Sequence, residues 1–86
     1  MIDNTSDGRL DTIVRWLKEK KWTRSFPGAY LVQFRSKKGN QFQYNTLFNT
    51  IVQMDDTGKV LDGASFMYGP YMGVTDWILA HDKERI

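Results

Sequence analysis

The residue types that most often carry chemistry are scarce in this sequence of 86 residues. It holds one histidine, His81, in the stretch AHDKE, and no cysteine. With one imidazole and no thiolate, a transition-metal site would have to depend on carboxylates. We therefore interpret His81 as a helix-end residue, where a positive charge suits the helix dipole. We predict no metal site and no cofactor.

Three aspartates, Asp55, Asp56 and Asp62, lie close together in the sequence. Their spacing does not follow the alternating pattern of a calcium-binding loop, which also requires a terminal glutamate. Aspartates are common in turns because they hydrogen-bond the backbone there, and this explains Asp55 and Asp56 without a metal. No convergent catalytic set is apparent, so we predict that the protein is not an enzyme.

The stretch GPYMGV at 69–74 brings glycines to the start of a predicted helix. Such glycines can bind a phosphate at a helix N-terminus. The lysine and the serine or threonine of a P-loop are absent, and Asp76 would repel an anion there. We read this stretch as a packed connection, in which Tyr71 is the residue that would reach a ligand.

Positive charge is the strongest signal in the sequence. The net charge is +2, yet residues 15–38 carry eight cations and one carboxylate, Glu19. Lopsided charge of this kind indicates an anionic partner, although lysine-rich helix faces and turns are also common as plain solvation. The cations are Arg15, Lys18, Lys20, Lys21, Arg24, Arg35, Lys37 and Lys38.

Aromatic residues lie next to these cations in the sequence, and we expect Trp22 or Tyr30 to stack on bases. The first hypothesis is therefore a small basic module that binds the phosphates of RNA or DNA, RNA favoured, with little sequence specificity. The alternative is a protein-binding inhibitor or adaptor of the kind that phages and mobile elements encode. Its basic surface would bind an acidic or nucleic-acid-binding host protein, with or without RNA.

Hydrophobic spacing predicts the elements that position these residues. An amphipathic helix is expected at 9–21 after a loose lead-in at 1–7, and Pro27 and Gly28 indicate a turn. Strands are expected at 29–36, 41–54 and 59–68, joined by turns at SKKGNQ and DDTG. In the last hairpin we expect Met54 opposite Val60, Thr50 opposite Ala64, and a bulge at Asp62-Gly63. A second helix is expected from Thr75, with Trp77, Ile78 and His81 on one side of it.

The segment QFQYNTLFNTIVQM, residues 41–54, has no charge, glycine or proline. We predict that it is the central strand of the sheet, because a strand with partners on both sides needs no charged residues against aggregation. Alternation would put seven residues on the core face, namely Phe42, Tyr44, Thr46, Phe48, Thr50, Val52 and Met54. The other face would carry amides, including Gln41, Gln43 and Asn45. Since a strand of this length is unusual, we expect a bend near Asn45 or Asn49.

Together these elements predict a single α+β domain over residues 1–86, in the order α-β-β-β-α, with a three-stranded antiparallel meander packed by two helices. This order is similar to that of the double-stranded RNA-binding domain family. The resemblance implies that the first helix (Arg15, Lys18) and the first hairpin loop (Lys37, Lys38) contact RNA. The family's third contact, a lysine-rich start of the second helix, has no counterpart in Gly73-Val74-Thr75-Asp76-Trp77.

No segment approaches 18 apolar residues and the N-terminus is polar, so we expect no membrane span and no secretory signal. We expect a cytoplasmic protein, in the host cytoplasm if the protein is viral. If the uncharged strand lay at the edge of the sheet, it would pair across the axis of a homodimer.

Overall fold

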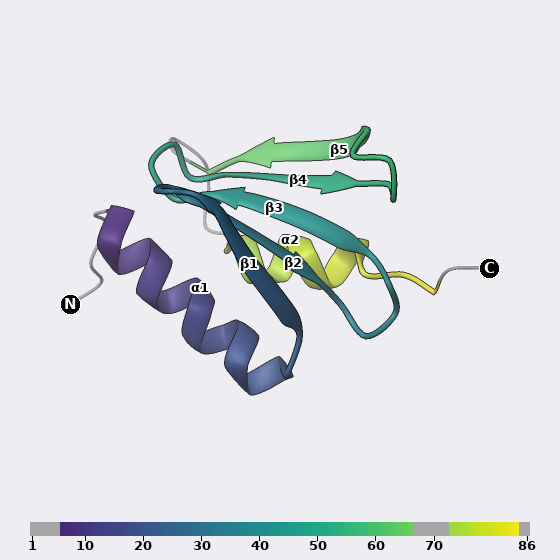
Figure 1. Cartoon of the computed structure of the whole chain (residues 1–86), viewed down its shortest axis with the longest axis horizontal. Coiled ribbons are helices and arrows are strands. Elements are labelled where there is room, and N and C mark those ends of the chain that lie inside the picture. Colours follow the sequence, from purple (N-terminus) through teal and green to yellow (C-terminus); the bar gives the residue numbers. More distant parts are fainter. Residues whose placement is uncertain (1–5, 67–72, 85–86) are drawn as a thin grey trace.

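The computed structural model describes residues 6–66 and 73–84 of the chain. These residues form an α+β domain with a five-stranded antiparallel sheet (Figure 1). Along the chain, one helix precedes the five strands and the other follows them. The prediction of an α+β domain with an antiparallel sheet is confirmed. The expected three strands and the order α-β-β-β-α are wrong, because the sheet has two further strands.

The helix α1, Ser6–Lys20, follows the predicted amphipathic pattern and begins three residues earlier than expected. The buried side chains of Ile13 and Leu17 face the sheet, and Leu10, Val14 and Trp16 pack around them. The helix ends where Lys21 adopts a positive φ of 60°, so that the Trp22 amide donates to the Leu17 carbonyl. This turn sends the chain directly into the sheet.

The strand β1, Thr23–Gly28, contains the residues that we expected to form a turn. Proline ends a helix and cannot donate a backbone hydrogen bond, which is why we expected a turn here. An edge strand can contain proline, because one side of the strand has no neighbour to which it must donate. β1 is an edge strand, and its pairing with β2, Leu31–Arg35, is irregular between Ser25 and Gly28, the stretch that holds Pro27.

The uncharged segment 41–54 forms two strands instead of one, β3 (Gln41–Asn45) and β4 (Thr50–Met54). The expected bend is a full hairpin turn, in which Asn49 has a positive φ of 54°. This turn changes which residues share a face. Phe42, Tyr44 and Thr46 are buried as predicted. Phe48 is exposed, and Ile51 lies in the core in place of Thr50, Val52 and Met54, which are only partly buried. Both strands have a partner on each side, which confirms that the segment is internal to the sheet.

The strand β5, Val60–Ser65, forms the other edge of the sheet. Met54 pairs with Val60 as expected, whereas Ile51, not Thr50, pairs with Ala64. The register shifts by one residue because Leu61 has no partner in the ladder, which places the bulge just before the predicted Asp62-Gly63. Residues 67 and 68 of the predicted strand lie outside the described residues.

The helix α2, Val74–His81, begins one residue before the predicted Thr75 and buries Trp77 and Ile78. Both helices pack on the same face of the sheet, since their buried residues share one core with alternate residues of β2, β3 and β4. We call this the helix face; its core side chains are Val32, Phe34, Phe42, Tyr44 and Ile51. The opposite face is the open face, because no helix in the described part of the chain covers it.

Candidate functional site

The fold brings the basic residues of three separate segments to one end of the sheet. The ladder pairs Thr23 with Arg35. Lys21, two residues before Thr23, and Lys37, two residues after Arg35, therefore lie at the same end of the sheet. We call this end, with the last turn of α1, the basic end (bottom of Figure 1). Its cations are Lys18, Lys20, Lys21, Arg24, Arg35, Lys37 and Lys38.

Most of these cations form no ion pair with the described residues. In the described residues no ion pair includes Lys18, Lys21, Arg24 or Lys37, and all four are exposed. Lys20 lies over the Trp16 ring, with Nζ 5.7 Å from its centroid. A cluster of exposed like charges destabilises the free protein and favours contact with an anion.

The two remaining cations of the basic end are partly compensated. Arg35 Nη1 lies 3.5 Å from an Asp56 carboxylate oxygen, and Lys38 Nζ lies 3.7 Å from Glu84. All four side chains are substantially exposed, so these pairs contribute little to stability. Both cations therefore keep donors for a further anion.

The turn that carries Lys37 and Lys38 is held by a polar cluster that the sequence did not reveal. Asn40 is only 8% exposed, and its side-chain amide donates to the Asp82 carboxylate and to the Lys83 carbonyl, both at 2.7 Å. The Ser36 hydroxyl donates to the same Asp82 oxygen at 2.6 Å. Because Asp82 follows α2 and Ser36 follows β2, no local sequence signal links them.

Neither expected aromatic residue is available at the basic end for stacking on a base. Trp22 is 7% exposed and lies in the core, where its ring stacks on Phe34 and meets the edge of Trp16. Its faces are covered, so we leave it out of the interface. Tyr30 is 46% exposed but lies in the β1–β2 turn, at the opposite end of β1. The six residues of β1 separate it from Thr23 by roughly 17 Å.

Arg15 lies about one turn of α1 before Lys18, outside the basic end. It is exposed on α1, five residues before the end of the helix and therefore about 8 Å from Lys20 along the axis. Its guanidinium pairs with Asp11 at 2.5 Å. Tyr71 lies outside the described residues.

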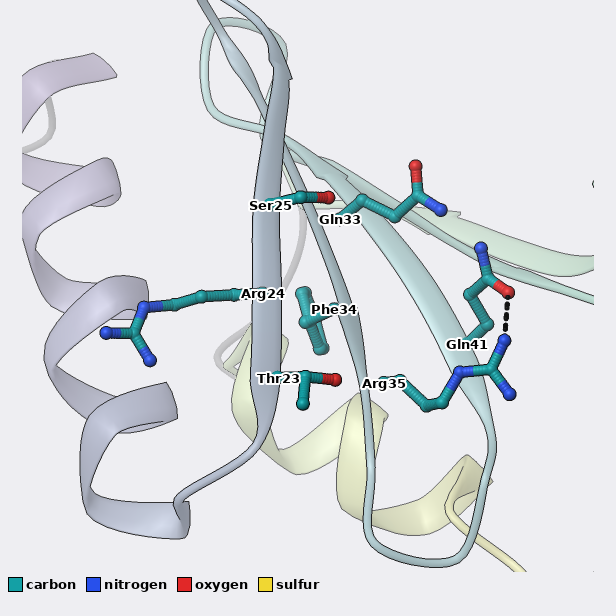
Figure 2. Close-up of a pocket in the computed structure, with 7 residues that line it drawn as sticks. All are labelled: Thr23, Arg24, Ser25, Gln33, Phe34, Arg35 and Gln41. Atoms are coloured by element: carbon teal, nitrogen blue, oxygen red, sulfur yellow. Dashed lines mark hydrogen bonds between the residues drawn. The ribbon is translucent and has the colours of Figure 1, made fainter.

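A shallow cavity of about 240 Å³ lies on the open face beside the basic end. Figure 2 shows the side chains of Ser25, Gln33, Gln41 and Arg35 on this side, whereas Arg24 points toward α1. Arg35 Nη2 donates to the Gln41 amide oxygen at 3.0 Å. The sequence predicted the amide of Gln41 on such a face, but not Thr23 or Ser25, because β1 was not expected to be a strand.

His81 makes a structural contact between α2 and β5. Its ring stacks on Trp77, with 3.7 Å between ring centroids, and its Nδ1 lies 2.8 Å from the Trp77 carbonyl oxygen. Nε2 lies 2.9 Å from the Asp62 carboxylate. The Gly63 amide, and then this imidazole, lower the pKa of Asp62 below its ordinary value. Both ring nitrogens are engaged within the protein.

Asp55 organises the β4–β5 turn, as turn chemistry predicted. Its carboxylate accepts hydrogen bonds from the Thr57 hydroxyl at 2.6 Å and from the Thr57 and Lys59 amides at 2.9 Å. The Thr57 hydroxyl bond makes the largest contribution to lowering the pKa of Asp55. Among the described residues no group of three or more histidine, cysteine or acidic side chains is placed to hold a metal ion.

Comparisons with protein-family models, with curated proteins and with solved structures found no match to this chain. In the described part of the chain, no helix is both long and apolar enough to cross a membrane.

Proposed function

We propose that the protein is a non-enzymatic module that binds the phosphates of a nucleic acid, RNA in preference to DNA, through its basic end. The observation that carries the proposal is the convergence of cations from the end of α1, from β1 and from the β2–β3 turn. Cations that only keep a surface solvated would have no reason to lie together at one end of the fold. Here the pairing of Thr23 with Arg35 brings them together.

The chemistry of the cations supports phosphate contact rather than base recognition. Lysine is a flexible point charge that neutralises a phosphate without reading a base. Neither of the exposed cations Lys21 and Lys37 has an aromatic ring in contact with it among the described residues. We therefore expect low sequence specificity and a binding constant that falls steeply as salt is added.

The test is fluorescence anisotropy with labelled single- and double-stranded RNA and DNA, at low and at moderate salt. The variant Lys37→Glu reverses a charge at the basic end. Lys59→Glu makes the same change in the β4–β5 turn, beside the opposite edge strand. We expect Lys37→Glu to weaken binding about tenfold and to reduce the salt slope by about one, and Lys59→Glu to have a smaller effect on both.

Two results would contradict the proposal. The first is the absence of binding to any of the four nucleic acids at low salt. The second is an equal loss of affinity in Lys37→Glu and Lys59→Glu, because binding would then follow net charge rather than the basic end.

A second candidate function, protein binding, is favoured by the edge strand β5. Val60 and Leu61 are 55% and 57% exposed on this strand, and an edge strand can accept a strand from a partner. A pull-down from nuclease-treated lysate tests it. Protein partners that survive the nuclease and are lost with Leu61→Lys would favour this candidate; partners lost with the nuclease would count against it.

A further inference from the structure

The cavity on the open face has the chemistry of a hydrogen-bonding surface. Five side chains from β1, β2 and β3 point into it, and we call them the polar trough: Thr23, Ser25, Gln33, Arg35 and Gln41. They provide two hydroxyls, two amides and one guanidinium, which together donate and accept. None of the residues that line the cavity is a carboxylate, although the exposed Asp56 carboxylate lies 3.5 Å from Arg35 Nη1.

The trough is unsuited to an unpaired nucleotide. Proteins that bind single strands stack the bases on exposed aromatic rings. The one aromatic residue that lines the cavity, Phe34, is 2% exposed and stacks between Trp22 and Phe42 in the core. A ligand of this trough must therefore offer polar groups at its surface rather than the face of a base.

Double-stranded RNA offers such a surface. Its A-form minor groove is wide and shallow and displays 2′-hydroxyls and base edges, whereas its major groove is too deep and narrow for side chains to read. The trough crosses three neighbouring strands, so it is about 10 Å wide. Its hydroxyls and amides can donate to and accept from a 2′-hydroxyl, which DNA lacks.

Arg35 links the trough to the basic end. Its guanidinium has five N–H donors, and the Gln41 amide oxygen, 3.0 Å from Nη2, holds its orientation on the open face. Arg35 is also the residue of β2 that pairs with Thr23, where the basic end begins. A duplex on the trough would thus have its phosphates next to Arg35 and to the turn with Lys37.

We propose that the polar trough binds the minor groove of double-stranded RNA and is the part of the protein that distinguishes RNA from DNA. This inference rests on the proposed function, since the basic end would hold the phosphates of the same duplex. Gln33 and Ser25 would hydrogen-bond 2′-hydroxyls, and Arg35 would contact the adjacent backbone.

The experiment compares three probes of one sequence: an RNA duplex, the corresponding DNA duplex and one RNA strand. Binding is measured for the wild type, for Gln33→Leu and for Ser25→Ala. The matched control is Ser65→Ala, since Ser65 is also exposed, pairs with Thr50 at the far side of the sheet and is not part of the trough. Thermal melting shows that each variant is folded.

We expect the wild type to prefer the RNA duplex to both other probes. Gln33→Leu and Ser25→Ala should each lower affinity for the RNA duplex about two- to tenfold, as the loss of one or two hydrogen bonds implies. Affinity for the DNA duplex and the salt slope should not change, because no phosphate contact is removed. Ser65→Ala should bind as the wild type does.

Equal wild-type affinity for RNA and DNA duplexes would overturn the inference and the proposed preference for RNA, while leaving phosphate binding through the basic end in place. Tighter binding of the single RNA strand, or an equal loss for both duplexes in the trough variants, would also overturn the inference. Failure of the proposed function is a different result, the absence of salt-dependent binding to all three probes.

Discussion

At the scale of single residues, Asn40 has a structural role that its neighbours in the sequence do not indicate. It follows Gly39, whose φ of 91° is part of the β2–β3 turn, and on that basis it would be an ordinary turn residue. In the folded chain its side chain is buried and joins this turn to the residues after α2. The position of Lys37 and Lys38 therefore depends on a contact across 42 residues of sequence.

Asn40→Ala should destabilise the protein by about 1–3 kcal/mol, because it leaves the Lys83 carbonyl and part of the Asp82 carboxylate without their donor. Urea unfolding at neutral pH measures the change in the free energy of unfolding. Gln43→Ala is the control, since this partly exposed amide makes no side-chain hydrogen bond to the described residues, and about 0.5 kcal/mol or less is expected. Equal effects of the two substitutions would show that the Asn40 cluster contributes nothing specific.

At the scale of elements, the β3–β4 turn determines which residues face the core. Asn45 begins it by accepting hydrogen bonds from the Leu47 and Phe48 amides, at 2.9 and 3.0 Å. Asn49 ends it in a left-handed conformation, and its side-chain oxygen accepts the Tyr44 hydroxyl proton at 2.5 Å. Burial raises the pKa of Tyr44, which keeps this hydroxyl protonated as the donor. Without the turn, Val52 and Met54 would occupy the core in place of Ile51.

Substitutions at Asn49 separate the two contributions of this residue. Asn49→Gly keeps the positive φ accessible but removes the acceptor for Tyr44, and should cost about 1 kcal/mol. Asn49→Ala adds the strain of a positive φ, for a total of about 2–3 kcal/mol. Chemical denaturation gives both values. If alanine proved no worse than glycine, the left-handed conformation would not be a requirement of this turn.

At the scale of the whole molecule, the distribution of charge lowers the stability of the free protein. The fold concentrates seven cations at the basic end, and only Arg35 and Lys38 among them form ion pairs with described residues. Such repulsion is removed by solvent screening or by an anionic partner, and it is a common cost of a functional surface. The stability of the free protein should therefore respond to charge removal at this end.

Lys37→Gln should raise the melting temperature by about 1–3 °C at low ionic strength, which corresponds to a few tenths of a kcal/mol. The gain should vanish at about 1 M salt, where the Debye length is only about 3 Å. Lys59→Gln should give no gain, because Lys59 lies beside the aspartates of the β4–β5 turn. Differential scanning calorimetry at both ionic strengths checks this, and a stabilisation by Lys59→Gln of equal size would argue against a local repulsion.

The sequence by itself determined the properties that depend on neighbouring residues. The amphipathic stripe of α1, the turn chemistry of Asp55, the second helix with its buried Trp77 and Ile78, and the internal position of segment 41–54 all follow from local pattern. The concentration of charge in residues 15–38 is likewise visible without a structure. These features could be predicted because helix periodicity and turn propensity act over a few residues.

Only the tertiary structure decided the features that depend on distant partners. Residues 23–28 form a strand because β2 offers them an edge, which outweighs the local signal of Pro27 and Gly28. The uncharged segment turns back at Asn49 because Tyr44 and Phe66 hydrogen-bond that residue. Trp22 is in the core because it directly precedes β1, whose partner β2 carries Phe34, and its ring packs against Phe34 and Trp16. Pairing and burial of this kind join residues far apart in the chain, so they are set by the whole fold and not by local pattern.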